Sequence, residues 1–340
     1  MRALDRLRDD LVVFTSRPEP LGPLRAPVVR VPLAVRPERG LPGHLARLVW
    51  LQTAFRRTVR ARGCRAVLNT MPEAMLGGTR PQVTVVHDLL PLFFPAEYPR
   101  QQHYFRHLVP RVLRRSRVVV ADSESTRQDV IRHCRLDPAR SQVIYPGYDR
   151  DAFAEEGSGL TAPPGDDPYF LYVGNLFPHK NLERVVAALA LVRRTHACRL
   201  VIRGEGRHRG ALDARVHALG MEEAVAFVPY VDEPALRRLY AGAVALAFPS
   251  LYEGFGFPVL EAMACGTPVL TSRCSSLPEV AGDAAVLVDP TSTTEVAGAM
   301  ERLLVDEGLR DSLRRRGREQ ARRFSWSETA ARFSELLDTL

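Results

Sequence analysis

The sequence predicts an α/β protein made of two doubly wound domains, each with a parallel sheet. Short apolar runs alternate with amphipathic stretches along the chain, which is the pattern of parallel strands covered by helices on both faces. The alternation is interrupted once, by a stretch rich in Pro, Gly and acidic residues at 151–168, which reads as a linker. The length of 340 residues also fits two domains better than one.

Five apolar runs of the first half have the composition of buried strands. They lie at 11–15, 66–69, 83–87, 118–121 and 142–145. Helical periodicity is found between them, at 44–62, 103–115 and 125–134. We assign residues 1–155 to a first domain and residues 156–168 to the linker.

The alternation restarts after the linker. Strands are predicted at 169–173, 199–202, 224–227, 245–248, 268–271 and 285–288, and helices at 182–195, 209–219, 234–242, 258–265, 277–281 and 294–305. We assign residues 169–325 to a second domain. A last helix at 327–338 lies within residues 326–340, which we expect to pack back on the first domain. Ligands of doubly wound sheets bind beyond the carboxyl ends of the strands, so the loops after the strands are the candidates for chemistry.

Charge differs between the two halves. Residues 1–150 hold 26 Arg against 13 acidic residues, whereas residues 151–340 hold 21 basic against 26 acidic residues. A basic first half indicates an anionic partner, although a solvated Arg-rich surface gives the same count. The Arg-rich stretch 106–117 lacks a nucleic-acid motif; it fits a basic helix on an anionic membrane surface, with a solvated helix face as the alternative. We therefore expect no nucleic-acid partner.

Several classes of protein and site are excluded. No apolar run approaches the roughly 20 residues that span a bilayer, and the first residues contain no apolar signal-peptide core. The five cysteines are scattered without a CxxC pair, as in a cytosolic protein with reduced thiols. We expect a cytoplasmic protein that can attach peripherally to the inner face of the membrane. Asp149-Arg-Asp151 spells a DxD motif, but it lies at the linker entrance, and no metal site is expected.

Lys180 is the one lysine among 47 basic residues. It lies in the loop after the first strand of the second half, which starts at Gly174 and Asn175 and leads into the helix at 182. A helix N-terminus attracts anions and disfavours cations. A lysine at this place is therefore best explained by a phosphate bound between the lysine and the helix N-terminus. An ordinary surface lysine is the alternative.

A second loop follows the strand at 245–248. It reads Glu253-Gly254-Phe255-Gly256-Phe257-Pro258, and Glu261 lies inside the next helix, whose first turn is a favoured position for proline. The two carboxylates can accept hydrogen bonds from hydroxyl groups, and the free amides of Gly256 and Phe257 can donate to oxygens. This arrangement favours a polyhydroxylated ligand; a capping Glu and a solvated Glu are the alternative.

These motifs resemble the donor-binding domain of glycosyltransferase family 4. The matching segments are YVGNLFPHKNLERVV, LVIRGEG, FPSLYEGFGFPVLEAMACGTPVL and SSLPEVAGDAAVLVDP. The first half is similar more loosely, through VVHDLLPLFFPAEYP, ADSESTRQDV and VIYPGYD. The resemblance implies the GT-B fold, in which two Rossmann-like domains face a cleft with the acceptor domain first, and a retaining glycosyltransferase of group 1.

The resemblance also implies roles. Glu253 resembles the Glu that binds the donor sugar, Glu261 the Glu that holds the ribose, and Lys180 the lysine that neutralises the diphosphate. His87 resembles a histidine that reaches the donor sugar across the cleft, with a structural role as its alternative. The catalytic set is then Glu253, Lys180 and His87. The donor-binding set is Gly174, Asn175, Lys180, Arg203, Glu253, Gly254, Phe255, Gly256, Phe257 and Glu261.

Two features depart from the family pattern. Members often carry Arg at the position of Asn175, and Asn supplies no charge to a diphosphate; Arg203, at the end of the next strand, is a candidate replacement. Members also usually open with a strand and a Gly-rich loop, whereas this chain begins in what reads as the following helix. The first strand and the Gly-rich loop of the first domain are therefore expected to be missing.

These observations predict a metal-independent, retaining hexosyltransferase of polysaccharide biosynthesis. It would move mannose from GDP-mannose to a glycan or lipid-linked acceptor, with the nucleotide sugar as co-substrate and no cofactor. The choice of mannose rests on resemblance to mannosyltransferases in HDLLPLFFP and GNLFPHKN. The alternatives are a truncated enzyme that prefers a UDP-sugar and a non-catalytic GT-B-like scaffold that binds nucleotide. A nucleic-acid binder with a steep salt dependence is the third hypothesis.

Overall fold

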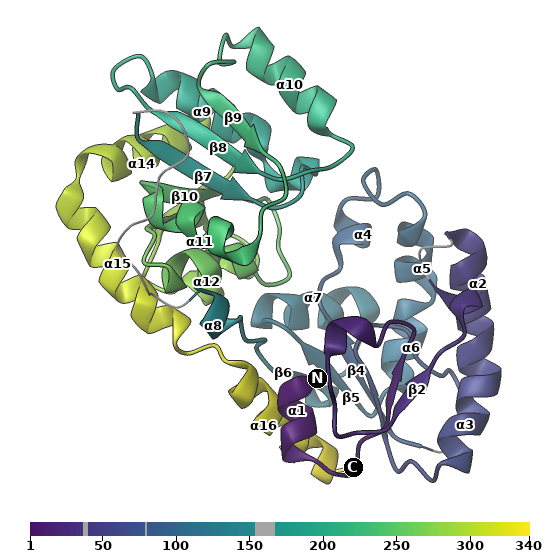
Figure 1. The fold of residues 1–340 in the computed structure, drawn as a ribbon. Helices are drawn as coiled ribbons and strands as arrows, with labels where there is room; N and C mark the ends of the chain where they lie inside the picture. Colours follow the sequence, from purple (N-terminus) through teal and green to yellow (C-terminus); the bar gives the residue numbers. More distant parts are fainter. Residues whose placement is uncertain (37–39, 79, 154–166) are drawn as a thin grey trace. The chain divides into compact units, whose positions relative to one another are not determined.

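The computed structural model describes residues 1–36, 40–78, 80–153 and 167–340 (Figure 1). They form two compact units, and each unit takes segments from distant parts of the sequence. Unit 1 comprises Met1–Leu92, Pro99–Gly147 and Trp326–Leu340, and unit 2 comprises Phe93–Tyr98 and Tyr148–Ser325. The linker expected at 156–168 falls almost entirely outside the described residues.

Unit 2 is built on one six-stranded parallel sheet with the strand order β12-β11-β10-β7-β8-β9. The strands are β7 (Tyr169–Val173), β8 (Arg199–Arg203), β9 (Val225–Val228), β10 (Ala245–Phe248), β11 (Val269–Ser272) and β12 (Val286–Val288). The helices are α8 (Arg150–Phe153), α9 (Leu182–Val192), α10 (Arg209–Ala218), α11 (Glu233–Gly242), α12 (Phe257–Ala264), α13 (Leu277–Ala281), α14 (Thr293–Val305) and α15 (Glu307–Ala321).

Helices cover both faces of the unit 2 sheet, which is why its central strands are apolar throughout. Every residue of β7 and β10 is buried. Helix α9 packs with α10 and α14, and α12 packs with α11 and α13; the two groups lie on opposite faces of the sheet (Figure 1). The chain runs outward from β7 through β8 and β9, then returns to β10 and runs outward the other way. Doubly wound sheets bind ligands at such a reversal, here between β7 and β10.

Unit 1 distributes its strands over two parallel sheets. One holds β1 (Val13–Thr15) and β2 (Val28–Arg30), and the other has the order β3-β4-β5-β6. The second sheet consists of β3 (Val67–Asn69), β4 (Gln82–Val86), β5 (Val118–Ala121) and β6 (Ser141–Val143). The helices are α1 (Arg2–Leu7), α2 (Leu41–Trp50), the π-helix η4 (Leu51–Phe55), α3 (Arg56–Ala61), α4 (Leu90–Phe93), α5 (Gln101–His107), α6 (Val109–Arg115), α7 (Glu124–Cys134) and α16 (Trp326–Asp338).

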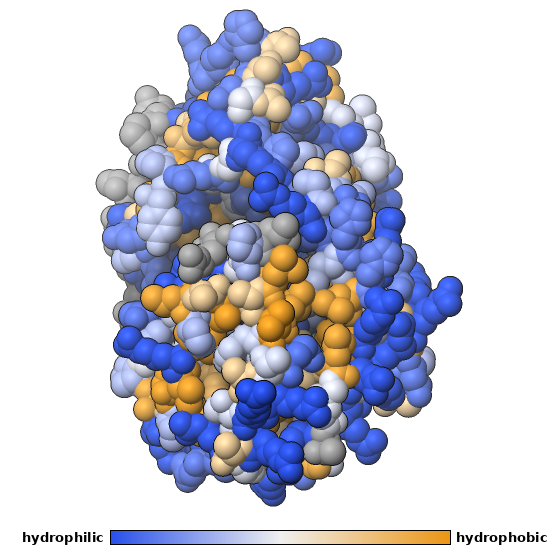
Figure 2. All heavy atoms as spheres, turned by 90° about the vertical axis from the view of Figure 1, so that its right-hand side faces the viewer, coloured by the Kyte–Doolittle hydropathy of each residue, from blue (hydrophilic) through white to orange (hydrophobic). Residues whose placement is uncertain are grey.

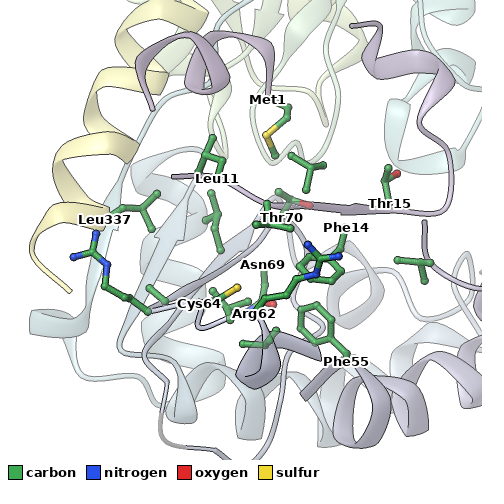
Figure 3. Close-up of a pocket in the computed structure, with 18 of the residues that line it drawn as sticks. Met1, Leu11, Phe14, Thr15, Phe55, Arg62, Cys64, Asn69, Thr70 and Leu337 are labelled. Atoms are coloured by element: carbon green, nitrogen blue, oxygen red, sulfur yellow. The ribbon is translucent and has the colours of Figure 1, made fainter. Parts of the chain in front are cut away.

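A cavity of about 720 Å³ lies between the facing edges of β1 and β3 (Figure 3). Residues 11–16 line one side and residues 64–71 the other. The Val13 N–H donates to Pro27 and the Thr15 carbonyl accepts from Val31, so Phe14, between them, directs its backbone N–H and C=O toward the cavity. In the described part of the chain, neither β1 nor β3 has a strand partner on this side. The first strand that we expect to be missing from the first domain would lie here, between β1 and β3. Its absence stays a prediction.

The predicted elements are confirmed with small shifts at their ends, except that the predicted helix at 103–115 is divided into α5 and α6. The predicted helix at 44–62 is the continuous run of α2, η4 and α3. The elements that were missed are the one-turn helices α4 and α8, strand β2 and helix α15. Strand β2 is only three residues long and lies between Pro27 and Pro32, which mask its pattern. Helix α15 was missed because its apolar stripe is narrow and surrounded by arginines.

Two segments join a unit that is distant in sequence. Apolar side chains of α16 and of the residue that ends the chain pack on the second sheet of unit 1, against Val83, Val85, Val120 and Ile144. They are Phe333, Leu336 and Leu337 of α16, together with Leu340. An ion pair of 2.6 Å between Arg8 and Asp338 also attaches α16 within unit 1. Phe93–Tyr98 belongs to unit 2, although a single boundary at 155 would place it in the first domain.

Candidate functional site

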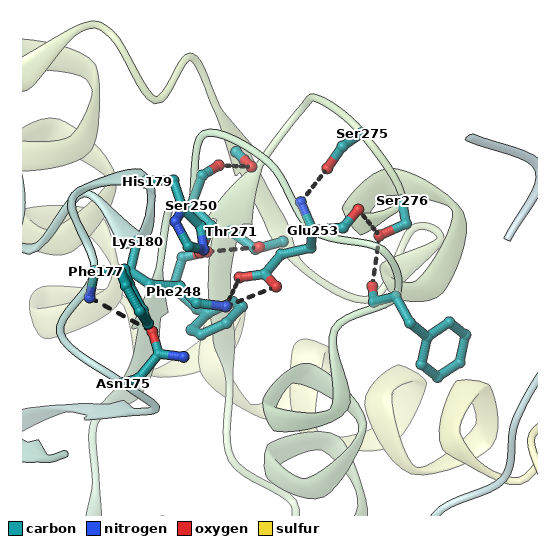
Figure 4. Close-up of polar contacts among 12 residues, drawn as sticks. Asn175, Phe177, His179, Lys180, Phe248, Ser250, Glu253, Thr271, Ser275 and Ser276 are labelled. Atoms are coloured by element: carbon teal, nitrogen blue, oxygen red, sulfur yellow. Dashed lines mark hydrogen bonds and ion pairs between the residues drawn. The ribbon is translucent and has the colours of Figure 1, made fainter. Parts of the chain in front are cut away.

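The candidate site lies in the loops that follow β7 and β10, at the carboxyl edge of the unit 2 sheet (Figure 4). Gly174 follows β7 with a φ of +148°. Gly204 follows β8, and a Cβ at this residue would come within 2.1 Å of the Gly174 carbonyl oxygen. Glycine at these positions therefore lets the loops after β7 and β8 touch.

The β7 loop is fixed to the β10 loop through Asn181. The chain forms a 3₁₀ turn, η6 (Pro178–Lys180), and enters α9 through Asn181, whose φ is +66°. The Asn181 side-chain amide donates to the carbonyls of Pro249 at 2.9 Å and of Pro290 at 2.7 Å. These bonds hold Lys180 next to the segment that carries Glu253.

Lys180 and Glu253 form an ion pair at this edge of the sheet (Figure 4). The Lys180 Nζ atom lies 2.7 Å from Oε1 and 2.8 Å from Oε2 of Glu253, and 5.6 Å from the centroid of the Phe248 ring. The two side chains are 12% and 10% exposed. The structure thus brings together two of the three predicted catalytic residues.

Two serines that the sequence analysis missed hold the Glu253 loop. Ser275 Oγ accepts from the Glu253 N–H at 2.9 Å. The Ser276 hydroxyl lies within 2.9 Å of the Glu253 carbonyl and 2.7 Å of the Phe255 carbonyl. Both serines belong to the quoted segment SSLPEVAGDAAVLVDP, so a signal for them was present.

Helix α12 begins directly after this loop. Gly256 precedes it with a φ of +122°, and a Cβ there would come within 2.8 Å of Leu277. No side chain caps the helix. Pro258 has no N–H and the Val259 N–H donates to the Gly256 carbonyl at 3.0 Å, so the Phe257 N–H is the one in the first turn that can be offered to a ligand. Phe255 is buried against Phe257 and Phe324, with ring centroids 5.2 and 5.7 Å away, and has a packing role. Gly254 lies in the loop between Glu253 and Phe255.

Glu261 lies one turn inside α12, where it contacts Tyr240 and feels the positive charge of Arg203. The buried Tyr240 hydroxyl donates to Glu261 Oε2 at 2.8 Å. Burial raises the pKa of Glu261, while the Tyr240 hydrogen bond and the Arg203 charge oppose the rise. The Arg203 guanidinium lies 4.9 Å from the centroid of the Tyr230 ring, and its buried Nε has no hydrogen-bond partner among the described residues.

Asn175 shapes the β7 loop. Its carbonyl accepts from the Tyr172 hydroxyl at 2.6 Å, and its side-chain oxygen lies 3.5 Å from the Phe177 nitrogen. These contacts stay within β7 and the loop that follows it. Asn175 is uncharged and so brings no positive charge to a diphosphate.

His87 lies in unit 1, directly after β4. Its Nδ1 lies 2.7 Å from Asp122 Oδ2 and its Nε2 lies 2.9 Å from the Thr70 carbonyl. The hydrogen bond to Asp122 is the main reason that the pKa of His87 rises to about 9. His87 is therefore an imidazolium at neutral pH, and both of its N–H groups are engaged within unit 1.

His179 and Glu97 are two further residues that sequence reasoning missed. Both are buried, and His179 Nδ1 lies 2.5 Å from Glu97 Oε2. His179 directly precedes Lys180. The signal for both was present in the quoted segments YVGNLFPHKNLERVV and VVHDLLPLFFPAEYP, but nothing in the sequence linked the two.

Among residues 1–36, 40–78, 80–153 and 167–340, no group of three or more His, Cys, Asp or Glu side chains could hold a metal ion. Asp149, from the DxD motif, instead accepts from the Ala152 N–H at 3.2 Å and so caps α8.

Comparisons with known proteins identify the family. The family model described as "Glycosyltransferase Family 4" matches residues 1–152, and the model "Glycosyl transferases group 1" matches residues 155–320. The chain belongs to glycosyltransferase family 4. The family models thus cover both halves, and the resemblance on which the site residues were chosen is confirmed.

Two relatives are O-antigen chain mannosyltransferases. Mannosyltransferase B of Escherichia coli is 30% identical over 267 residues, which cover 72% of this chain and 66% of that protein. RfbU of Salmonella typhimurium is 28% identical over 236 residues, which cover 69% of this chain and 64% of that protein. The chain therefore spans just under two thirds of the length of these curated relatives.

Solved structures show the same fold. Sucrose-phosphate synthase from Thermosynechococcus elongatus superposes with a TM-score of 0.81 at 22% identity, covering 99% of this chain and 90% of that one. Anabaena Alr3699/HepE in complex with UDP and glucose superposes with a TM-score of 0.78 at 20% identity, covering 100% and 94%. The expected GT-B class of two parallel-sheet domains is thus confirmed.

Proposed function

We propose that this protein is a retaining glycosyltransferase that transfers a hexose from a nucleotide sugar to a glycan or a lipid-linked acceptor. The observation that carries the proposal is the ion pair of Lys180 and Glu253 at the reversal point of the unit 2 sheet. One side chain is suited to a diphosphate and the other to sugar hydroxyls. Membership of family 4 supports the assignment.

The ion pair explains how the site would receive its donor. In the structure, Glu253 neutralises the Lys180 ammonium. A diphosphate carries more negative charge than one carboxylate, so a bound donor would take over the ammonium as its partner. The Glu253 oxygens would then be released to accept hydrogen bonds from the donor sugar. Glu261 would hold the ribose, as the family resemblance implies.

The same groups would stabilise the transition state. Breaking the bond between the anomeric carbon and the phosphate oxygen builds positive charge on the sugar and negative charge on the phosphate. Lys180 and the uncapped N-terminus of α12 would oppose the charge on the phosphate as it develops. For a retaining enzyme, the acceptor hydroxyl would attack from the side of the departing phosphate, which would take its proton. This proposal uses no metal, because Lys180 and the helix supply the positive charge.

For the donor we propose GDP-mannose. The support is that the two relatives described above are both O-antigen chain mannosyltransferases. A UDP-sugar is the competing donor, since one structural neighbour was solved with UDP and glucose. The acceptor class, a glycan or a lipid-linked glycan, is supported by the same relatives.

Nucleotide release from a panel containing GDP-mannose and UDP-glucose tests this proposal, with a membrane extract as the source of acceptor. We expect release by the wild-type chain and a loss of about 10²–10³-fold in Lys180→Ala and in Glu253→Ala. Glu319→Ala is the matched control, because Glu319 is exposed on α15. Equal release by all four proteins would contradict the proposal.

A second candidate is a scaffold that binds nucleotide sugar without turning it over. The cavity between β1 and β3 favours it, because the two sheets of unit 1 are not joined at this position. Calorimetric binding of GDP or UDP that requires Lys180, without release in any acceptor mixture, would support the scaffold.

We further propose that the protein is cytoplasmic and docks on an anionic membrane surface through unit 1. None of the helices in the described residues is long and apolar enough to cross a bilayer. Exposed apolar side chains are found on α2 and on the turn that packs against it, namely Leu33, Leu45 and Val49, and Figure 2 shows apolar residues gathered on the lower half of that view. Arg111, Arg114 and Arg115 are exposed on α6.

Sedimentation with vesicles tests the membrane proposal. We expect binding to vesicles that contain phosphatidylglycerol and not to pure phosphatidylcholine, with a loss of binding as salt is raised. Replacing Arg111, Arg114 and Arg115 by Gln should weaken it. Binding of equal strength to both kinds of vesicle would contradict the proposal.

A further inference from the structure

We propose that Glu97 is a positioning residue that fixes the Lys180–Glu253 pair through His179. Glu97 lies 82 and 83 residues before His179 and Lys180 in the sequence. It is nevertheless in the same compact unit, because Phe93–Tyr98 belongs to unit 2. The proposal deepens the proposed function, since it concerns the same pair of charges.

The Glu97 carboxylate holds both the ring and the backbone of His179. Its Oε2 lies 2.5 Å from His179 Nδ1, and its Oε1 accepts from the His179 backbone N–H at 3.1 Å. Burial lowers the pKa of His179, which favours the neutral ring, and the Glu97 oxygen beside Nδ1 favours the tautomer with its proton on Nδ1. The carboxylate therefore accepts two hydrogen bonds from one residue and fixes the turn that ends at Lys180.

His179 transmits this constraint to the second loop. Its backbone carbonyl accepts from the Leu251 N–H at 2.8 Å. Leu251 lies two residues before Glu253 in one loop, and His179 lies one residue before Lys180 in the other. One buried histidine thus fixes the spacing of the two loops whose charged side chains meet.

Aromatic packing leaves the His179 ring little freedom. The ring centroids of Phe94, Phe177 and Tyr98 lie 5.2, 5.7 and 6.3 Å from that of His179, and the His179 side chain is 0% exposed. Phe93 also packs on Tyr252, at 4.8 Å between centroids, directly beside Glu253.

A second contact holds Glu97 itself in place. The Arg207 guanidinium donates to the Glu97 backbone carbonyl and stacks on Phe177, 5.1 Å from its centroid. Phe177 in turn stacks on Tyr98 at 5.3 Å. The segment Phe93–Tyr98 is therefore held by polar and aromatic contacts on both sides of Glu97, as a fixed support for the charged pair needs.

Hydrogen exchange tests the positioning role independently of any activity. In Glu97→Ala, we expect amides in 176–182 and in 249–255 to exchange at least about 10-fold faster, because the two bonds to His179 are lost. Peptides covering β11 (Val269–Ser272) serve as the internal reference, and Glu319→Ala as the control variant. Unchanged exchange in both loops would overturn the proposal, whether or not the protein proves to be a glycosyltransferase.

Kinetics and rescue variants give the second test. A loop displaced by about 1 Å can cost on the order of 10²-fold in rate, so Glu97→Ala should lower kcat or raise the donor KM while the acceptor KM is unchanged. His179→Asn should retain most activity, because its amide nitrogen can replace Nδ1 as donor, whereas His179→Phe should not. Equal loss in both His179 variants, or an equal rise of both KM values, would overturn the proposal.

A double-mutant cycle shows whether Glu97 acts through His179. If it does, Glu97→Ala combined with His179→Phe should be no worse than the more damaging single variant. Additive losses would mean that Glu97 acts by another route and would overturn the proposal. Glu97→Gln keeps the shape of the side chain and covers the case in which Glu97→Ala does not fold.

Discussion

Both units are built on parallel strands, but unit 2 has one continuous sheet whereas unit 1 has two separate sheets. In unit 2, the strands on either side of the reversal, β7 and β10, are paired neighbours, and the loops after them carry Lys180 and Glu253. In unit 1, the corresponding reversal lies between β1 and β3, which flank a cavity and are not paired. Where the two strands at the reversal are paired, as β7 and β10 are, the loops after them come within ion-pair distance. Where they are not paired, as with β1 and β3, the facing strand edges have no strand partner in the described residues.

Removal of one carboxylate from each unit should have very different effects on catalysis. Glu253→Gln should lower kcat/KM by about 10²–10³-fold, because the donor site loses a carboxylate beside Lys180. Glu73 lines the unit 1 cavity and pairs with Arg47, so Glu73→Gln is the matched change and should alter kcat/KM only a few-fold. Steady-state nucleotide release measures both, and a larger loss in Glu73→Gln would reverse the comparison.

Matched leucine substitutions compare the packing of the two sheets. Leu246 in β10 is fully buried, so Leu246→Ala should cost about 2–5 kcal/mol. Leu68 in β3 is half-buried and lines the cavity, so Leu68→Ala should cost less than about 2 kcal/mol. Both tryptophans, Trp50 and Trp326, belong to unit 1. Tryptophan fluorescence in urea therefore reports unit 1, and circular dichroism reports both units.

Added volume should have opposite effects in the two units. Ala66 lines the cavity, so Ala66→Val should stabilise unit 1 by about 0.5–2 kcal/mol. Ala247 in β10 is fully buried, and Ala247→Val should destabilise unit 2 by about 1–3 kcal/mol through overpacking. Urea midpoints with the same probes measure both. If Ala66→Val were as damaging as Ala247→Val, the unit 1 site would have no room to fill.

The smallest effect concerns pH and is confined to unit 1. His87 has a pKa of about 9, raised mainly by its hydrogen bond to Asp122. A raised pKa means that the stabilisation is complete below the ordinary value of 6.5 and is lost as the pH rises through about 9. Titration of the His87 ring by NMR should show the high pKa, and Asp122→Asn should lower it. A midpoint near 6.5 in the wild-type chain would contradict the hydrogen bond.

The sequence predicted most of the elements and both loops of the candidate site, because their signals are local. Apolar runs, Gly256 before Pro258 and the isolated lysine can all be read within a few residues of each other. The bond between Glu97 and His179 could not be predicted, because it joins positions that are distant in the chain. The direct contact of Lys180 with Glu253 also depends on the order of strands in the sheet, which periodicity does not specify.

Strand β2 was missed although its signal is local. Its residues carry the right composition, but a strand of three residues flanked by Pro27 and Pro32 is too short for alternation to be recognised. The ion pair of His87 was missed because Asp122 directly follows another strand, β5, and is 35 residues away.

The packing of α16 on unit 1 bears on how the chain folds during synthesis. The sheet formed by β3 to β6 is completed by residue 143, yet the side chains that cover one of its faces come from residues 333–340. These four side chains cannot cover that face until the ribosome has made residues 333–340. The segments of unit 2 are all complete by Ser325. Because domains generally fold as units during synthesis, we expect the unit that is translated first to be the last to reach its final packing.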